Sequence, residues 1–471
     1  MVIIGREKEK ALLKQYYESD SPEFLAVYGR RRIGKTYLIR EFFEGNFTFY
    51  ATGLANKAKC EQLRAWNDAI NSSFKGQSEP ASNWFDAFVL LRNKLEGLNT
   101  SNRKVIFIDE APWMDTVRSG FLTALEFFWN GWASGRQDIF LIICGSSTSW
   151  IVNNLLKNRG GLYNRVTRRM RLLPFTLKET EEYLKENEFS IDRYRICEAY
   201  MIFGGIPYYL SLLSRGMSIP RNVDALCFSE DAILKGEFSE IYSSLFKNPD
   251  IYIQIVIALA KKGIGLTRDE IIKETKVTSG GLLTKVLTEL ELCGFIRSYP
   301  NYLLNSNVCV FQLIDPFTLF FIHFIYDRNI RNPRFWTSNL DSPSISAWKG
   351  YAFEMVCLSH AEQIKQGLGI SAISTETSSW KSRTSKPGAQ IDLVIDRKDG
   401  IINLCEFKYS KGEYAISDTE EMALRKKIVA FERETKTKKA VRLTMVTTFG
   451  IENNKYSGVV QSEVILKDLF S

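Results

Sequence analysis

The sequence predicts an α/β protein of several domains, with a parallel-sheet core near the N-terminus and a second α/β domain near the C-terminus. Three observations lead to this prediction. A glycine-rich loop separates an apolar run from a helical segment within 24–43. A second apolar run, 104–110, ends in two carboxylates, and the runs 390–396 and 401–408 are joined by an Asp-Gly turn. With 471 residues, the chain is long enough for two to four domains.

The composition excludes several classes of protein. Eight cysteines are scattered without a C-x-x-C pair, and there are two histidines, which argues against zinc, a disulfide framework or a histidine metal centre. The net charge of +8 is a mild indication of an acidic partner such as nucleic acid. The sequence shows neither a signal peptide nor an apolar run of membrane-spanning length, so we expect a cytoplasmic protein without a membrane partner.

The glycine-rich loop has the pattern G-x-x-x-x-G-K-[ST], which is typical of a phosphate-binding loop between a strand and a helix. Its residues are Gly29, Arg30, Arg31, Arg32, Ile33, Gly34, Lys35 and Thr36. The glycines allow backbone N–H groups to surround a phosphate at a helix N-terminus. We expect Lys35 to contact the β- and γ-phosphates, Thr36 to bind Mg²⁺, and Tyr37 to belong to the same nucleotide contact.

Two further apolar runs predict the rest of this site. The run 104–108 is followed by Asp109, expected to hold Mg²⁺, and by Glu110, expected to orient and deprotonate the attacking water. The pair is a weak signal alone, but its position downstream of the loop strengthens it. The run 139–144 leads to Ser146, a candidate hydrogen-bond sensor of the γ-phosphate, although an ordinary strand-to-helix turn explains it equally well.

An arginine-rich segment follows. We expect one of its arginines to approach the γ-phosphate as an arginine finger, either in its own chain or in a neighbouring copy. The favoured candidate is Arg165. The favoured alternative is a solvated basic face. The other arginines of the segment are Arg168, Arg169 and Arg171.

These motifs resemble the archaeal-type P-loop ATPases, a branch of the STAND class related to AAA+ proteins. The matching pieces are 4–7, the arginine-rich loop, 107–110, 144–146 and 204–207. The resemblance covers roughly 1–235 and implies ATP and Mg²⁺ as cofactors. It implies a P-loop NTPase core at 1–175 and a helical lid at 176–240, in which Pro207 contacts the adenine.

The middle of the chain, 241–315, predicts a winged helix, because three helical stretches precede two strands at 295–299 and 308–313. Its third helix, 282–290, contains only one basic residue, Lys285. We therefore favour a protein-contact role over reading of DNA sequence. An aromatic connecting helix and linker are expected at 316–345.

The C-terminal domain, 346–471, carries a second candidate site. On the strand 401–408, Glu406 and Lys408 project to one face, and Asp392 on the neighbouring strand can join them. Two carboxylates, Asp392 and Glu406, suit Mg²⁺, and a lysine can orient water or stabilise the transition state. This pattern resembles the PD-(D/E)XK restriction-endonuclease-like α/β fold, and Glu354 matches the acid on its first helix. Isoleucine replaces the family's proline before the first acid, and Trp380 and Lys381 are additional candidate phosphate or base contacts. The expected helix 418–434 offers a surface for a phosphate backbone, with the basic residues Arg425, Lys426, Lys427 and Arg433.

Two main functions follow. In the first, ATP binding and hydrolysis control a C-terminal Mg²⁺-dependent nuclease that acts on DNA. In the second, the ATPase is a signalling switch or scaffold that forms a homo-oligomer. The C-terminal domain then binds nucleic acid or protein without cutting. A DNA-translocating motor is a weaker third possibility.

Overall fold

The computed structural model describes residues 3–99, 102–157, 160–162, 164–263, 265–278, 280–300, 302, 309–382 and 389–471. The chain forms two compact units, Met1–Pro174 and Phe175–Ser471. Among the described residues, no helix is long and apolar enough to cross a membrane.

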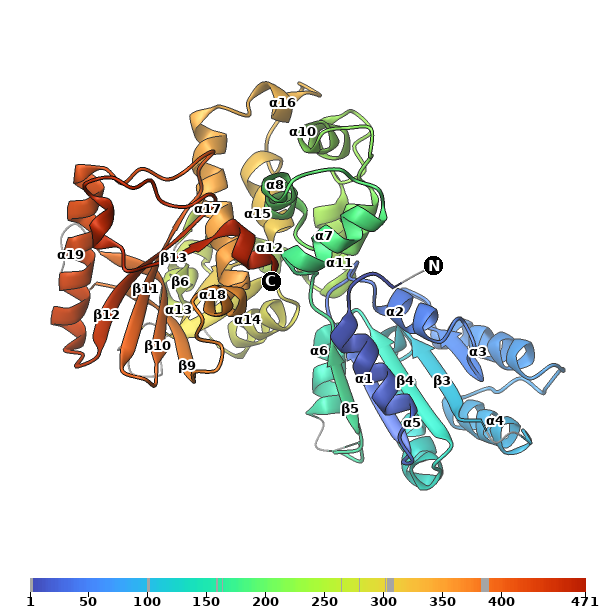
Figure 1. Ribbon diagram of the computed structural model, residues 1–471. Coiled ribbons are helices and arrows are strands. Elements are labelled where there is room, and N and C mark those ends of the chain that lie inside the picture. Colours follow the sequence, from blue (N-terminus) through green and yellow to red (C-terminus); the bar gives the residue numbers. More distant parts are fainter. Residues whose placement is uncertain are drawn as a thin grey trace. The chain divides into compact units, whose positions relative to one another are not determined.

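The first unit is built on a five-stranded sheet with the order β2-β3-β4-β1-β5, in which all neighbours are parallel (Figure 1). This confirms the predicted parallel-sheet core. Because β4 lies between β1 and β3, the ends of these three strands meet at one edge. The strands are β1 (Glu23–Tyr28), β2 (Phe49–Thr52), β3 (Lys104–Asp109), β4 (Ile139–Gly145) and β5 (Arg168–Arg171).

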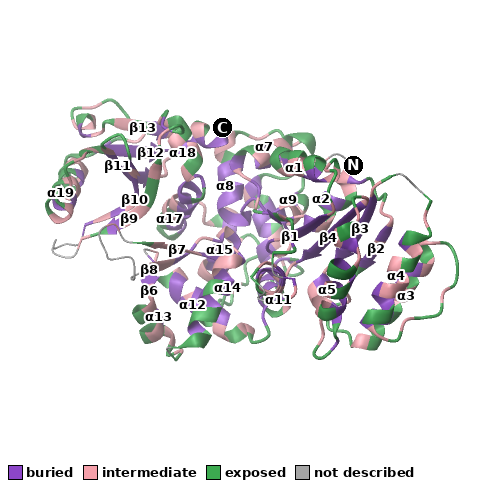
Figure 2. Cartoon of the chain, turned by 90° about the horizontal axis from the view of Figure 1, so that it is seen from below, coloured by how far each residue is buried: buried purple, intermediate pink, exposed green. Residues whose placement is uncertain are grey.

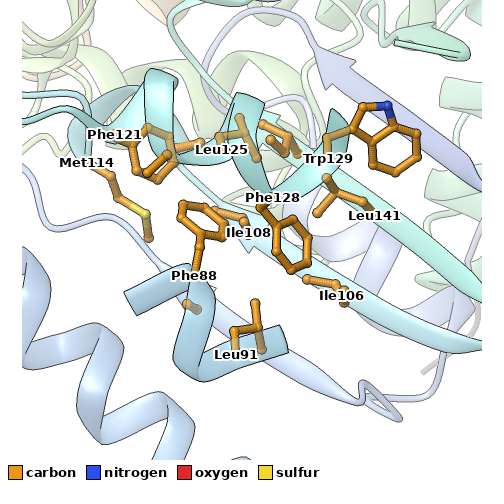
Figure 3. Packing of buried hydrophobic residues seen from close by; sticks show 14 of the residues in the cluster. Phe88, Leu91, Ile106, Ile108, Met114, Phe121, Leu125, Phe128, Trp129 and Leu141 are labelled. Atoms are coloured by element: carbon orange, nitrogen blue, oxygen red, sulfur yellow. The ribbon is translucent and has the colours of Figure 1, made fainter. Parts of the chain in front are cut away.

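Apolar side chains fix these strands in place. β3 and β4 are buried along their whole length (Figure 2). Alternate residues of β3, Ile106 and Ile108, pack with Phe88, Phe121 and other aromatic residues of the helices on that side (Figure 3). The helices of this unit are α1 (Glu7–Tyr17), α2 (Lys35–Phe42), α3 (Lys59–Ser73), α4 (Trp84–Glu96), α5 (Phe121–Gly131) and α6 (Thr148–Trp150), with shorter turns η1 (Ala111–Trp113), η2 (Ala133–Gly135) and η3 (Ile151–Leu156).

The second unit begins with a helical segment and continues into a small mixed segment. The helical segment contains α7 (Leu177–Glu186), α8 (Arg193–Phe203), α9 (Pro207–Ser211), α10 (Ile219–Val223), η4 (Asp224–Phe228) and α11 (Glu237–Leu245). The mixed segment contains α12 (Pro249–Lys261), β6 (Leu266–Thr267), α13 (Arg268–Thr275), α14 (Gly281–Leu292), β7 (Ile296–Pro300) and β8 (Cys309–Leu313). Its strands form an antiparallel sheet with the order β6-β8-β7. Residue 308 of the second expected strand lies outside the described residues.

The C-terminal part contains a five-stranded mixed sheet with the order β13-β12-β11-β10-β9. β9, β10 and β11 are antiparallel neighbours, whereas β12 runs parallel to β11 after the crossover helix α19. The expected hairpin at 390–408 is confirmed. The strands are β9 (Thr375–Lys381), β10 (Gln390–Arg397), β11 (Ile401–Lys408), β12 (Ala440–Thr447) and β13 (Ser462–Ile465). The helices are α15 (Pro316–Phe324), α16 (Phe335–Ser338), α17 (Pro343–Ser359), α18 (Ala361–Gly367) and α19 (Asp418–Thr435), with turns η5 (Ser457–Val459) and η6 (Leu466–Phe470).

Candidate nucleotide site and candidate C-terminal site

The loop between β1 and α2 follows a path that requires glycine at both ends. Gly29 has φ +148°, and a Cβ atom there would lie 2.4 Å from the carbonyl oxygen of Leu172. Gly34 has φ +83° at the start of α2. Side chains at these positions would be strained or would collide with backbone. The glycines therefore allow the loop to fold back over the N-terminus of α2.

Lys35 is the central cation of this loop. It is 5% exposed, and its Nζ donates to the carbonyl oxygens of Gly29 and Arg30 at 2.9 Å and to Ser146 Oγ at 3.2 Å. Among the described residues, no carboxylate lies within ion-pair distance of this ammonium. A buried charge with only neutral partners is costly unless an opposite charge joins it. The loop therefore fits an anionic ligand such as the phosphates of ATP.

Thr36 and Asp109 form the adjacent pair of oxygen ligands. The Thr36 hydroxyl donates to Asp109 Oδ2 at 2.8 Å. Burial raises the pKa of the Asp109 carboxyl, and the hydrogen bond from Thr36 opposes that rise. No group of three or more His, Cys, Asp or Glu within the described ranges could hold a metal ion. Mg²⁺ at this site would therefore depend on Thr36, Asp109 and phosphate oxygens, a donor set that suits a hard cation.

Ser146 connects Lys35 with Glu110. Its backbone N–H donates to Glu110 Oε2 at 3.0 Å, and its hydroxyl donates to the other carboxylate oxygen. The same hydroxyl accepts a hydrogen bond from Lys35. Ser146 can reach both residues because β4 lies between the strands that precede them. In this arrangement Ser146 holds both oxygens of the carboxylate that is expected to activate water.

The structure contradicts the prediction that Arg165 reaches the phosphates of its own chain. β5 runs parallel to β1, and the register pairs Arg171 with Tyr28, directly before the loop. Arg165 precedes the start of β5, so it lies toward the opposite edge of the sheet. A finger supplied to a neighbouring copy stays a prediction. Arg168 is also structural, because it forms a 2.8 Å ion pair with the buried Glu23.

The remaining predicted nucleotide contacts occupy different positions. Ile33 is buried, and its carbonyl oxygen accepts a hydrogen bond from Arg6 at 3.4 Å. Arg32 has a left-handed φ of 75°, whereas Tyr37 is 43% exposed on α2. Pro207 is the first residue of α9 in the second unit, and its contact with adenine stays a prediction.

In the second unit, three carboxyl groups gather at the predicted C-terminal site. The register that pairs Leu393 with Cys405 places Asp392 beside Glu406. Glu354 comes from α17, which packs against β11. Burial, followed by repulsion from Glu406 and Glu354, raises the pKa of Asp392. Burial also raises the pKa of Glu354 to about 7, with a further contribution from Glu406.

Two lysines are arranged differently from the sequence prediction. Lys427, expected on an exposed phosphate-binding face of α19, donates to both oxygens of the buried Glu406 at 2.7 and 2.8 Å. Lys408 forms an ion pair with Glu420 at 2.6 Å. Mg²⁺ bound by Asp392 and Glu406 would therefore have to displace the Lys427 ammonium. Carboxylate oxygens suit a cation, but Lys427 already supplies one to Glu406, and among the described residues these acids do not, as they lie here, form a three-residue group that could hold a metal ion.

The suggestion that Trp380 contacts nucleic acid is wrong. Its indole is 2% exposed and packs edge-on against Phe431 in the core beneath α19. Sequence reasoning also missed Arg297 of β7, which lies in the electrostatic environment of Glu354 and Asp392. In the sequence, Arg297 is distinguished only by its position in a short apolar strand. That position does not indicate carboxylate neighbours about 100 residues away in the chain.

Comparisons with known proteins give similarities for most of the chain. Residues 3–213 match a family model described as an ATPase domain predominantly from Archaea. The uncharacterized protein MJECL04 of Methanocaldococcus jannaschii is 24% identical over 259 residues, which cover 55% of this chain and 54% of that protein. The chain thus spans about half the length of this curated relative.

Two solved structures match about two thirds of this chain, and the likeness to the first concerns the fold alone. The Walker-type ATPase PABY2304 of Pyrococcus abyssi has a TM-score of 0.50 and 19% identity, covering 68% of this chain and 96% of that chain. Cdc6p of Pyrobaculum aerophilum has a TM-score of 0.33 and 13% identity, covering 67% of this chain and 92% of that chain.

Proposed function

We propose that residues 3–213, which match a model of an ATPase domain predominantly from Archaea, bind and hydrolyse ATP and control a Mg²⁺-dependent nucleic-acid nuclease site in the C-terminal part of the same chain. The nucleic acid is DNA in this proposal. The observation that carries the proposal is the cluster of Glu354, Asp392 and Glu406 on α17, β10 and β11.

The roles at the nucleotide site follow from the contacts. Lys35 binds the phosphates, because its buried ammonium has only neutral acceptors. Thr36 and Asp109 hold Mg²⁺, which when bound neutralises phosphate charge. Glu110 accepts a proton from the attacking water once its carboxylate is released by Ser146. Ser146 is suited to this exchange because its hydroxyl already contacts Lys35, beside the expected γ-phosphate.

The element order supports the proposal, because helices α17 and α18, three antiparallel strands, the crossover helix α19 and the strands β12 and β13 follow one another as expected from the resemblance to a restriction-endonuclease-like domain. Asp392 and Glu406 would hold Mg²⁺, which supplies charge stabilisation at a phosphodiester. Glu354 is placed to assist as a proton donor or acceptor. Lys408, on the same face of β11 as Glu406, would stabilise the developing charge after exchange from Glu420.

A cleavage assay on labelled linear and circular DNA tests this proposal. The wild type, Lys35→Ala and Asp392→Ala would be compared with Mg²⁺ or Mn²⁺, with and without ATP. We expect cutting by the wild type, none by Asp392→Ala, and altered cutting by Lys35→Ala. Asp392→Ala should retain ATP hydrolysis, since it belongs to the other unit. Cutting that persists in Asp392→Ala would refute the assignment of the nuclease site.

A switch or scaffold without cleavage is the second candidate, and one observation favours it. Lys427 already pairs with Glu406, so the protein itself supplies the countercharge that a metal ion would bring to this carboxylate. This alternative predicts ATP binding and hydrolysis without DNA cleavage under any nucleotide. The same assay therefore separates the two functions.

A further inference from the structure

Arg297 brings a positive charge from the mixed segment to the C-terminal carboxyl cluster. It lies on β7, and β7 lies beside β9 of the C-terminal sheet. Its guanidinium is stacked over the ring of Tyr299, 4.5 Å from the ring centroid. Glu354 and Asp392 are both among the charges that act on it. The C-terminal site is thus bordered by a residue from outside the C-terminal sheet.

The charge of Arg297 is not taken up by a carboxylate. Its Nε and Nη2 donate to a neutral acceptor, Gln312 Oε1, at 2.9 and 2.7 Å. Within the described part of the chain, Arg297 forms no ion pair, whereas Glu406 is paired directly with Lys427. The Nη1 edge of the guanidinium donates no hydrogen bond to any described residue. An arginine held on one edge, with its other edge open, is arranged to bind an anion with paired oxygens.

Tyr351 provides a second donor at the same place. It lies on α17, one helical turn before Glu354, and it is within electrostatic range of Arg297. Its hydroxyl is buried and has no acceptor for its proton within hydrogen-bond geometry, although the Gln312 side chain lies close enough to act on the hydroxyl oxygen as a donor. Buried hydroxyl groups are nearly always paired in folded proteins, because an unpaired one is destabilising. The missing partner is therefore an acceptor atom that a ligand would supply.

We propose that Arg297 and Tyr351 form a phosphate-binding subsite beside Asp392 and Glu406, which takes a phosphodiester of the nucleic-acid backbone. This inference rests on the proposed function and extends it by assigning where the substrate is held. A phosphodiester offers two non-bridging oxygens, one for the guanidinium edge and one for the tyrosine hydroxyl. The subsite needs both β7 and α17, so the mixed segment is part of the nuclease site and not only a spacer.

Binding of fluorescent duplex DNA to the full chain tests the subsite without cleavage. Anisotropy would be measured in EDTA at several salt concentrations. We expect Arg297→Gln to weaken binding about tenfold and to reduce the salt-dependence slope by about 0.9, because one phosphate contact is lost. Arg215→Gln is the matched control, because this exposed arginine is paired with Glu188 and its loss removes the same charge. It should bind DNA like the wild type.

Tyr351→Phe separates ligand binding from a structural role. The change removes a buried hydroxyl whose proton has no acceptor in hydrogen-bond geometry, so thermal stability should stay about the same or rise. If the subsite binds phosphate, DNA affinity should nevertheless fall several-fold. Arg297→Lys keeps the charge but loses the planar fork, and it should restore the salt slope without restoring the full affinity.

The possible outcomes distinguish the subsite from the proposed function. Unchanged DNA affinity in both Arg297→Gln and Tyr351→Phe, or absence of DNA binding by the wild type, would overturn the subsite. Tighter binding or faster cutting by Arg297→Gln would overturn it too, since Arg297 would then be a counter-ion for the carboxylates. Binding that depends on both residues, in a wild type that does not cut DNA with Mg²⁺, would support the subsite and refute the nuclease.

Discussion

The stability of the second unit should fall steeply in mild acid, because a buried histidine there must stay neutral. His360, directly after α17, is 1% exposed. Its Nε2 accepts a hydrogen bond from the backbone N–H of Leu177 at 3.0 Å, and its Nδ1 lies 2.8 Å from the carbonyl oxygen of Val356. With one nitrogen accepting and the other donating, the ring is neutral. Burial lowers the pKa of His360 from 6.5 to about 4.

The size and the direction of the effect follow from this pKa. The unfolded chain binds a proton near pH 6.5, whereas the folded chain resists protonation until about pH 4. The stabilisation is therefore fully present above pH 6.5 and is lost as the pH falls toward 4. At 1.36 kcal/mol for each pH unit, the loss is about 3 kcal/mol, a large part of the stability of an ordinary domain.

Equilibrium urea unfolding between pH 7.5 and 4.5, followed by tryptophan fluorescence, measures this loss. The wild type should show the decline, and His360→Gln should start less stable at pH 7.5 but depend less on pH. His323→Gln is the control, because His323 is the other histidine of the chain and is only half-buried. It should keep most of the wild-type decline. An identical pH dependence in wild type and His360→Gln would refute the reasoning.

Three other predictions concern single contacts. Glu110→Gln should keep ATP binding but lower the rate of phosphate release by about 10²- to 10⁴-fold, and a smaller loss would exclude Glu110 as the base. Gly29→Ala should lower both the melting temperature and the affinity for ATP, because its Cβ would lie 2.4 Å from a backbone oxygen. Gly135→Ala, with open space around the Cβ, should change neither, and equal effects would contradict the steric argument. Glu198→Ala should destabilise the second unit by about 3–5 kcal/mol in urea, since it leaves the buried Lys349 unpaired; a loss below about 1 kcal/mol would show that water replaces the pair.

The parts of the structure that the sequence predicts are those encoded by neighbouring residues. The strand, loop and helix around Lys35 appear as expected, because glycine spacing and apolar runs are local properties. The contact between Asp392 and Glu406 also follows from local information. A tight turn at Asp399 and Gly400 sets the register of the hairpin, and the register brings the two acids together.

Contacts that depend on strand direction or on a crossover could not be predicted in this way. The sequence shows a run of arginines, but only the direction of β5 beside β1 decides which of them approaches the loop. Likewise, Lys427 lies among other basic residues on α19, and nothing in the sequence indicates that its surroundings differ from those of Lys426. Helix α19 packs against β12, and in this position Lys427 reaches inward to Glu406 on β11, whereas Lys426 is exposed. Charge patterns therefore predict a basic helix, but they do not predict which of its lysines is paired with a buried carboxylate.

Helix α17 connects the helical segment of the second unit with the proposed nuclease site. Lys349 of this helix forms a buried ion pair of 2.6 Å with Glu198 on α8, and the same carboxylate accepts a hydrogen bond from Tyr409, directly after Lys408. Farther along α17, Glu354 reaches the carboxyl cluster. A shift of α8 must therefore either move α17 and the end of β11 or break a buried pair, which is costly. Since α8 lies within the residues matched by the ATPase family, any nucleotide-driven movement of that helix would be transmitted directly to the proposed nuclease site.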